Sequence, residues 1–500
     1  FIFILYEYLT YYERNIMKKF YAGLVVIGTS AFFSGANAQD YDAQIDALQN
    51  ELLKIKQEMG KSSSKAYFKK GKGLSIKSSD GKYEFAIKGR AMFDMAALLG
   101  GNSLADYSTT GATGCDNCSR ADDIGTFGQE FRRLRFSIKV KIGDGWALAF
   151  QPDFAETVSD NSNTGGKGVD VKDAYISKAF KGFGKLYFGN AKSAGGMWEN
   201  TSSNSILFME RPMYNEAANL AHRAGIHYDS SGAMGPFHLR VALTAGAEGA
   251  WRQENEDSDS VEDRYNVSGA AHYTWSKMND YWGGLSLGKN HKLMVGASWS
   301  YENLSDAGTR DIEARAQGVH TLGEKIQDGA LANVNDYTYG GPQFAYTNGP
   351  LFVAGEWFYV TADRHETTIS AARTDKAYGD YQASGGSAFA HYFLTGNTSV
   401  PLSAKKGKIG GVKCKGKFGC TAVKVMYEQW NGAHSELSEV GTDAKVMHFG
   451  INHYFNSNVR LMIDAARGLY INGTGLNSDD LGSNHEGNLT SVQARLHFKW

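Results

Sequence analysis

The sequence predicts an all-β protein, a 16-stranded antiparallel transmembrane β-barrel with a short N-terminal coiled-coil helix. Three observations carry this prediction: the composition, the last strand, and a regular succession of short and long connections. The chain has 59 Gly, 27 Tyr and 27 Phe but only 6 Pro, which fits many strands and turns. Apolar residues make up an ordinary 42%, as expected for a barrel in which only alternate residues meet lipid.

The chain ends NLTSVQARLHFKW, and from Ser491 to Trp500 polar and apolar side chains alternate strictly. One face of this strand carries Val492, Ala494, Leu496, Phe498 and Trp500, and the other carries Ser491, Gln493, Arg495, His497 and Lys499. We expect Trp500 at the membrane interface, in the periplasmic aromatic girdle of an outer-membrane barrel. The alternative, an edge strand of a soluble sandwich, does not explain the many other strands.

Sixteen strands are predicted, joined alternately by short turns such as GDG at 143–145 and by long polar loops such as 98–129. Both ends then fall on the short-turn side, which is the periplasmic side of such a barrel. The predicted spans are 82–97, 130–142, 145–154, 170–179, 184–190, 222–229, 236–246, 264–276, 292–302, 341–346, 351–361, 388–397, 420–430, 445–455, 458–467 and 490–500.

The N-terminal part divides into three segments before the barrel. Residues 1–16 precede a plausible start methionine and are interpreted as upstream translation. Residues 17–38 are interpreted as a secretory signal peptide, since two lysines, a short apolar run and Ala-Asn-Ala follow one another. A membrane anchor is the alternative, and the shortness of the apolar run argues against it.

Residues 39–60 predict a periplasmic helix with a heptad seam, and such a seam needs partner chains. The seam is formed by Tyr41, Ile45, Leu48, Leu52, Ile55 and Met59. A helix folded onto its own domain is the alternative. We expect residues 61–81 to be a linker and residues 82–500 to be the barrel domain.

If apolar strand residues face lipid, the alternate residues face water, and these are mainly basic. They include Lys88, Arg90, Arg133, Arg135, Lys139, Lys141, Arg240, Lys424, Arg460, Arg495 and Lys499, against Glu84, Asp94, Asp153, Glu356, Glu428 and Asp464. The whole chain has a formal net charge of −1, so this excess is local to the lumen. A positively charged lumen concentrates anions. A chance excess in any water-filled barrel is the alternative.

The connection at 190–221 is unusual because SNSILFMERPM places apolar residues in an expected surface loop. A loop that folds into the barrel and packs on its wall would narrow the pore. In an exported protein the cysteines should form two local disulfides, Cys115 with Cys118 and Cys414 with Cys420. Zinc bound by all four is disfavoured because the pairs fall on opposite sides of the membrane.

Several segments resemble the phosphate-selective porin O and P family, in family order over residues 82–500. They include EFRRLRFSIKVKIGDGWALAFQPDFA, DVKDAYI, KLYFGNAKS, ENTSSNSILFMERP, AFAHYFLTGN and HFGINHYFNSNVRLMIDAARG. The resemblance implies a homotrimeric outer-membrane porin whose third loop constricts the channel, with small anions and membrane lipid as its partners. It implies no enzymatic reaction and no cofactor, and the charge balance does not suggest nucleic acid.

The resemblance also implies lysines beside the TSS tripeptide in phosphate-selective members. Here Glu199 and Asn200 precede it and Asn204 follows it. Lys192 and Arg211 could supply part of the charge, with Glu210 as a possible partner of Arg211. We therefore expect an anion-preferring or weakly selective channel. An adhesin barrel and, on weaker grounds, a barrel-embedded hydrolase are the alternative functions.

Overall fold

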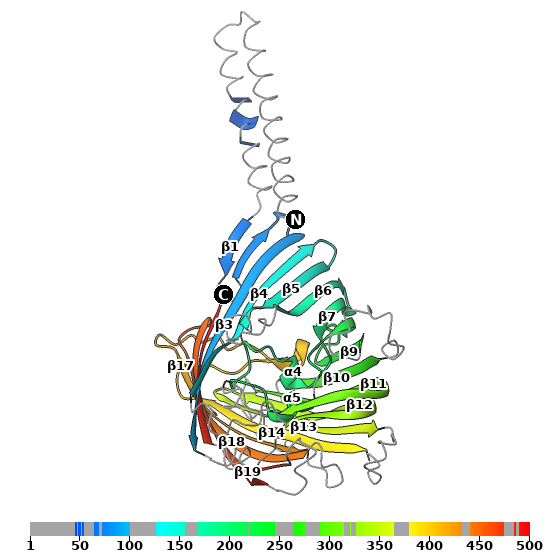
Figure 1. Ribbon diagram of the computed structural model, residues 1–500. Coiled ribbons are helices and arrows are strands. Elements are labelled where there is room, and N and C mark those ends of the chain that lie inside the picture. The colour runs from blue at the N-terminus through cyan, green and yellow to red at the C-terminus, as the bar shows by residue number, and fades with distance from the viewer. Residues whose placement is uncertain are drawn as a thin grey trace, which may run out of the picture. The chain divides into compact units, whose positions relative to one another are not determined.

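The computed structural model is a closed antiparallel barrel with two chain segments folded inside it (Figure 1). It describes residues 65–69, 73–100, 127–155, 169–218, 220–245, 264–276, 291–314, 321, 327–364, 380–432, 441–474, 485–486 and 490–500, and parts of 46–54. The barrel belongs to a unit that spans Lys65–Trp500, and residues Phe1–Ser64 form a second unit. Among the described residues, no helix has the length and apolarity to cross a membrane.

Sixteen long strands form the wall, and each predicted span corresponds to one of them. They are β3 (Tyr83–Gly100), β4 (Phe127–Ile142), β5 (Trp146–Asp153), β6 (Asp170–Phe180), β7 (Gly184–Lys192), β8 (His222–Asp229), β9 (Phe237–Ala245), β10 (Tyr265–Ser276), β11 (Lys292–Ala314), β12 (Gln327–Asn348), β13 (Leu351–Arg364), β14 (Tyr381–Phe393), β17 (Cys420–Asn431), β18 (Gly441–Tyr454), β19 (Val459–Thr474) and β21 (Thr490–Lys499). β21 pairs with β3, with Arg495 opposite Asp94, and this pairing closes the barrel. The prediction of a 16-stranded barrel is confirmed.

The prediction of a linker at 61–81 is wrong for its central part. β1 (Lys65–Lys69) and β2 (Gly73–Lys77) form a hairpin, and β2 pairs with residues 84–87 of β3. β21 pairs with the same edge of β3 from Arg90 onward. β3 is longer than its closing partner, so β2 supplies hydrogen-bond partners for the edge that β21 leaves open.

The predicted coiled-coil helix remains a prediction. The described residues between 46 and 54 are helical and exposed, but the six seam residues lie outside the described residues. The segments 1–16 and 17–38 and the pair Cys115 and Cys118 also lie outside them.

Trp500 lies at the junction of β2, β3 and β21. Its backbone exchanges two hydrogen bonds with Gly89, each 3.2 Å long. Its ring contacts Phe136 and Phe498, with centroid distances of 5.6 and 5.7 Å. A Cβ atom at residue 89 would overlap the indole, so the close approach requires glycine there. The aromatic end of the chain thus covers the closing seam.

The loop after β7 folds into the barrel, as predicted. It carries two short helices, α4 (Met197–Asn200) and α5 (Met213–Ala218), which Figure 1 shows inside the ring of strands. Trp198, Phe208 and Tyr214 are almost fully buried in the main hydrophobic cluster. Each such side chain contributes about 1.5–3 kcal/mol by leaving water.

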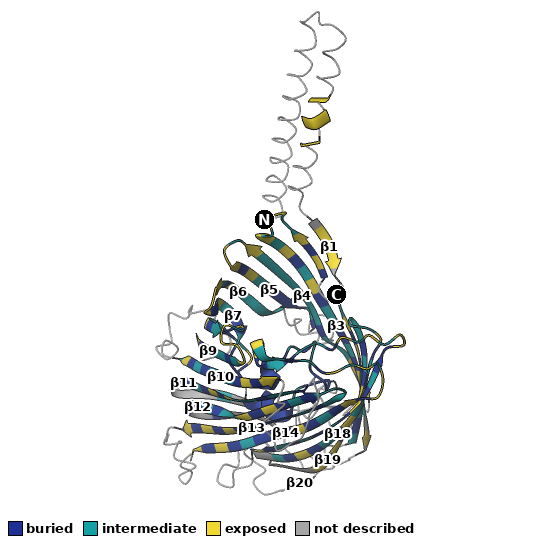
Figure 2. Cartoon of the chain, turned by 180° about the vertical axis from the view of Figure 1, so that it is seen from behind, coloured by how far each residue is buried: buried dark blue, intermediate teal, exposed yellow. Residues whose placement is uncertain are grey.

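Apolar residues of the wall pack against this loop. In this part of the barrel the inward side chains are therefore not all polar, as the prediction from alternation assumed. In β13, Phe352, Phe358 and Val360 are buried on the inner face while Tyr359 is exposed on the outer face. Figure 2 shows the alternating buried and exposed bands along the strands. The lumen therefore has an apolar half, which the loop fills, and a polar half.

A second segment enters the barrel between β14 and β17. It contains β15 (Leu402–Ser403), the 3₁₀ turn η3 (Ala404–Lys406) and β16 (Lys408–Ile409). Its Lys408 Nζ donates to Asn200 O at 3.1 Å, and Ile409 N donates to Thr201 Oγ1 at 3.3 Å. The two inward segments therefore contact each other.

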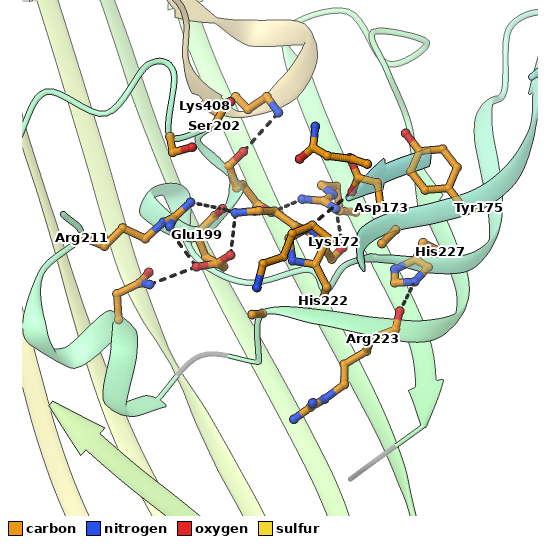
Figure 3. Close-up of a pocket in the computed structure, with 18 of the residues that line it drawn as sticks. Lys172, Asp173, Tyr175, Glu199, Ser202, Arg211, His222, Arg223, His227 and Lys408 are labelled. Atoms are coloured by element: carbon orange, nitrogen blue, oxygen red, sulfur yellow. Dashed lines mark hydrogen bonds and ion pairs between the residues drawn. The ribbon is translucent and has the colours of Figure 1, made fainter. Parts of the chain in front are cut away.

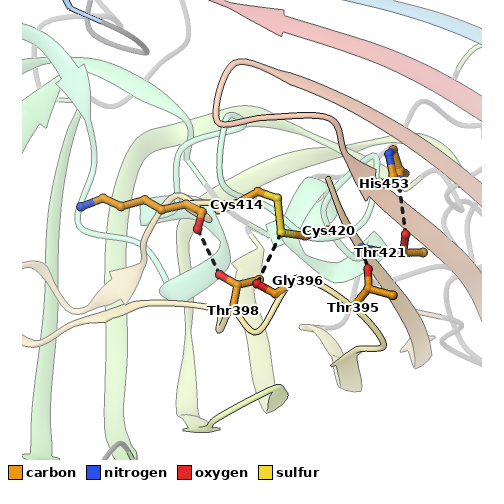
Figure 4. The surroundings of a disulfide bond; sticks show 8 residues. Thr395, Gly396, Thr398, Cys414, Cys420, Thr421 and His453 are labelled. Atoms are coloured by element: carbon orange, nitrogen blue, oxygen red, sulfur yellow. Dashed lines mark hydrogen bonds between the residues drawn. A yellow bond between two sulfur atoms is a disulfide. The ribbon is translucent and has the colours of Figure 1, made fainter. Parts of the chain in front are cut away.

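The predicted disulfide between Cys414 and Cys420 is present at the end of this second segment (Figure 4). Nearby, Thr398 Oγ1 donates to Lys413 O at 3.1 Å, and Thr421 N donates to Thr395 Oγ1 at 2.9 Å. These bonds join the two ends of the connection where it leaves the wall.

Candidate pore

The polar half of the lumen contains a cavity of about 820 Å³. β3–β9, β11, the loop after β7 and the segment at 404–408 contribute to its lining, and Figure 3 shows the side chains around Glu199. Twelve of its lining residues are basic: Arg90, Arg132, Arg133, Arg135, Lys172, Lys192, Arg211, Arg223, Arg240, Arg310, Lys406 and Lys408. Six are acidic: Asp173, Glu199, Glu210, Glu216, Asp229 and Glu302.

Four of the ten predicted pore-lining basic residues border this cavity, namely Arg90, Arg133, Arg135 and Arg240. Arg135 Nε lies 2.5 Å from Asp153 Oδ2, and Arg240 Nη2 donates to Lys192 O at 2.9 Å. Three others, Lys88, Lys139 and Lys141, lie at the paired ends of β3 and β4 near the GDG turn. They are outside the cavity lining, and Lys141 pairs with Glu84 at 2.5 Å.

The remaining three, Lys424, Arg460 and Arg495, do not line this cavity, and this corrects the prediction. They point inward but are buried beneath the loop. Lys424 Nζ donates to Leu207 O at 2.8 Å, Arg460 Nη1 donates to Ile206 O at 2.8 Å, and Arg495 Nη1 donates to Met209 O. They satisfy carbonyls of an irregular segment that has few backbone partners of its own.

Three predicted inward acidic residues do the same for the N–H groups of the loop. Glu356 accepts from Met197 N at 2.7 Å, Glu428 from Met213 N at 2.7 Å, and Asp464 from Met209 N at 3.0 Å. The charged inward residues of β13, β17, β19 and β21 therefore hold the loop in place by hydrogen bonds to its backbone. The alternation of polar and apolar residues predicted that these residues face inward, but it does not reveal that the loop covers them.

Two β-bulges bring neighbouring residues into the lumen together. Met92 pairs with Arg133 and Phe93 pairs with Phe131, so Arg132 is the extra residue of a bulge. Lys172 is likewise skipped between Val171 and Asp173. Arg132 and Lys172 therefore border the cavity beside Arg133 and Asp173, although strict alternation would point them outward.

The neighbouring residues Arg132 and Arg133 both bind the carboxylate of Glu210. Arg133 makes a bidentate contact with it at 2.9 and 2.7 Å, and Arg132 Nε and Arg495 Nη2 lie 3.3 and 2.5 Å from Oε1. Burial alone would raise the pKa of Glu210, but these arginines hold it well below its usual range. The expected pairing of Glu210 with Arg211 is therefore wrong.

Arg211 and Lys192 instead both contact the carboxylate of Glu199, which lies on α4. Lys192 Nζ lies 2.6 Å from Glu199 Oε1, and Arg211 Nε lies 3.4 Å from Oε2. Asn204 lies outside this cavity, where its Oδ1 is 2.9 Å from His497 Nε2. The loop thus brings Lys192, Glu199 and Arg211 together but separates them from Asn204.

Lys406 and Lys408 were missed because their segment was interpreted as an ordinary connection. KKGKIGGVKCKGK contains six lysines at 405–417, which is the sequence signal for a basic segment. Its entry into the barrel depends on buried Val400, Leu402 and Ile409. Within the described part of the chain, no group of three His, Cys, Asp or Glu residues could hold a metal ion.

One family model and several solved structures are similar to this chain. The family model described as phosphate-selective porin O and P matches residues 101–500. No curated protein matches the chain. Similar solved structures include an anion-selective porin from Comamonas acidovorans, with 13% identity, 84% of this chain and 100% of that chain covered, and a TM-score of 0.46. Another is Salmonella typhi OmpF in complex with daunomycin, with 13% identity, 84% and 98% coverage, and a TM-score of 0.43.

Proposed function

The chain belongs to the phosphate-selective porin O and P family, and we propose that it is an outer-membrane porin through which small anions diffuse passively. The observation that carries this proposal is the charge of the cavity lining, with twelve basic and six acidic residues. A net positive charge around a cavity inside a low-dielectric wall raises the local concentration of anions.

The position of the basic residues also supports anion preference. They come from the wall, from the loop after β7 and from the segment at 404–408, so they surround the polar half of the lumen. The apolar loop fills the other half, so the polar half is the part of the lumen through which a hydrated ion would pass. Passive diffusion through this space needs neither a reaction nor a cofactor.

We further propose a homotrimer with its short turns on the periplasmic side. The heptad seam predicted at 39–60 supports this arrangement because such a seam needs partner chains. Small inorganic anions, including phosphate, are the proposed solutes. Tight phosphate binding is not expected, since the two basic residues of the constriction, Lys192 and Arg211, already share the carboxylate of Glu199.

The direct test is electrical recording of the purified protein in a planar lipid bilayer with a KCl gradient. The proposal predicts channels whose reversal potential shows preference for chloride. Adding phosphate to the wild type should change the chloride current only weakly. Cation preference would contradict the proposed selectivity, and absence of conductance would contradict the porin function.

A further inference from the structure

Glu199 is bound inside the cavity as a free oxyanion would be. Its Oε1 accepts from Lys192 Nζ at 2.6 Å, and its Oε2 accepts from Asn215 Nδ2 at 3.0 Å and lies 3.4 Å from Arg211 Nε. An ammonium, a guanidinium and an amide are donor types that proteins use to bind carboxylate and phosphate. Figure 3 shows the Glu199 carboxylate between its partners.

The donors are held in place by contacts that do not involve this carboxylate. Arg211 Nε donates to Trp198 O at 2.9 Å, and its Nη2 donates to Thr201 O at 3.0 Å. Lys192 Nζ donates to the backbone carbonyl of Glu199 at 2.5 Å. Removing the carboxylate would therefore leave both cations directed toward the same space.

Glu199 is also more enclosed than the two cations that bind it. The exposed side-chain fractions are 6% for Glu199, 22% for Lys192 and 16% for Arg211. Burial alone would raise the pKa of Glu199, but Arg211 and Lys192 hold it well below its usual range, so the carboxylate is charged at neutral pH. All three side chains line the cavity together with Asn215.

We propose that Glu199 is a tethered anion that fills an oxyanion subsite formed by Lys192, Arg211 and Asn215, and that it limits the selectivity of the channel. This inference rests on the proposed function, because it assumes that anions pass through the cavity. Glu199 competes with permeating oxyanions for the two cations. The subsite becomes available to phosphate only when the carboxylate is removed.

Glu210 differs from Glu199 in its partners. It is bound by Arg495, which also holds Asp94 of the wall and the carbonyl of Met209. Its carboxylate therefore anchors the loop to the barrel. Among the described residues, Glu199 forms ion pairs only with Lys192, the last residue of β7, and with Arg211 of the loop itself, so its removal should leave the loop docked.

The test compares Glu199→Gln with Glu216→Gln in the planar-bilayer assay. Glu216 lies on α5 and lines the same cavity, so both variants remove one negative charge from one lumen. Charge-assisted hydrogen bonds contribute roughly 1.5–3 kcal/mol, which corresponds to about 10- to 100-fold in affinity. We expect phosphate to block chloride current in Glu199→Gln at concentrations about 10- to 100-fold lower than in wild type or Glu216→Gln.

A second variant and a second measurement make the result specific. Glu199→Gln combined with Arg211→Gln should lose the phosphate block. Phosphate should also raise the thermal unfolding temperature of Glu199→Gln but not of Glu216→Gln, because a ligand that binds only the folded state stabilises it. Equal phosphate sensitivity of the two single variants in both assays would overturn the inference.

The two proposals fail in different ways. A wild-type channel that prefers cations or does not conduct contradicts the proposed function, whatever the variants do. An anion-preferring wild type with no gain of phosphate binding in Glu199→Gln contradicts the subsite alone. The thermal measurement does not depend on conductance, so it tests the subsite in either case.

Discussion

Replacing Arg495 by alanine should loosen the inward loop and destabilise the barrel at its closing seam. Arg495 is fully buried and holds Asp94 with Nε and Nη2 at 2.7 and 2.5 Å. The same Nη2 contacts Glu210 Oε1 at 2.5 Å, and Nη1 donates to Met209 O. One side chain therefore joins β3, β21 and the loop.

The magnitude follows from what each partner loses. Glu210 retains Arg132 and Arg133, so its charge stays compensated. Asp94 loses its ion pair with Arg495 and stays buried. Breaking a buried ion pair in this way costs about 3–5 kcal/mol, because one charge is left without its partner. We expect the free energy of unfolding to fall by that amount.

The assay is urea unfolding of the protein in detergent micelles, followed by tryptophan fluorescence. Arg467→Ala is the matched control, since Arg467 lies on the neighbouring strand β19 and is exposed. Its loss should change stability by no more than about 0.5 kcal/mol. Adding Asp94→Asn to Arg495→Ala should restore about 1–3 kcal/mol, because it removes the uncompensated charge. A loss below about 1 kcal/mol in Arg495→Ala, or no restoration, would refute the docking role of this arginine.

Two further predictions concern the closing seam and pH. Gly89→Val should displace the Trp500 indole from Phe136 and Phe498. The free energy of unfolding should fall by about 1–3 kcal/mol, because each of the two aromatic pairs contributes about 0.5–1.5 kcal/mol. An equal loss in a Trp500→Ala background would contradict this explanation. Burial, with Arg240 and Lys406 nearby, lowers the pKa of Lys408 to about 8 from 10.5, although Asp229 and Asp173 oppose the shift. Anion preference should therefore decrease as the pH rises from 7 to 9, and Lys408→Met should reduce this pH dependence. Between about pH 8 and 10.5 the Lys408 amine binds more protons in the unfolded chain than in the folded chain. The contribution of Lys408 to the free energy of unfolding should therefore increase as the pH rises, and urea titrations at several pH values measure it.

The strands could be predicted because lipid acts on every one of them in the same way. Each outer face must be apolar, so period-two alternation marks strands such as β4 and β21 without knowledge of the rest of the fold. The inward loop was also predictable, because SNSILFMERPM is too apolar for a solvated connection. These features depend only on the local sequence and on the lipid or water that surrounds it.

The roles of the inward residues could not be predicted, because the lumen is not one environment. Arg240 and Arg495 have the same chemical type and both face inward, yet Arg240 borders the cavity and Arg495 lies beneath the loop. The bulge at Arg132 reverses the phase of β4 at one residue, which the alternation alone does not reveal. Contacts between distant segments decide both outcomes.

Seven of the inward basic residues form two sets with different roles: Arg90, Arg133, Arg135 and Arg240 line the cavity, whereas Lys424, Arg460 and Arg495 dock the loop. The most direct test compares Arg90→Gln with Arg460→Gln, two identical substitutions at inward arginines, by reversal potential in a KCl gradient. Arg90 lines the cavity, whereas Arg460 is buried outside its lining and donates to Ile206 O. We predict that Arg90→Gln lowers the chloride-to-potassium permeability ratio and that Arg460→Gln leaves the ratio unchanged. An equal decrease in both variants would contradict the division.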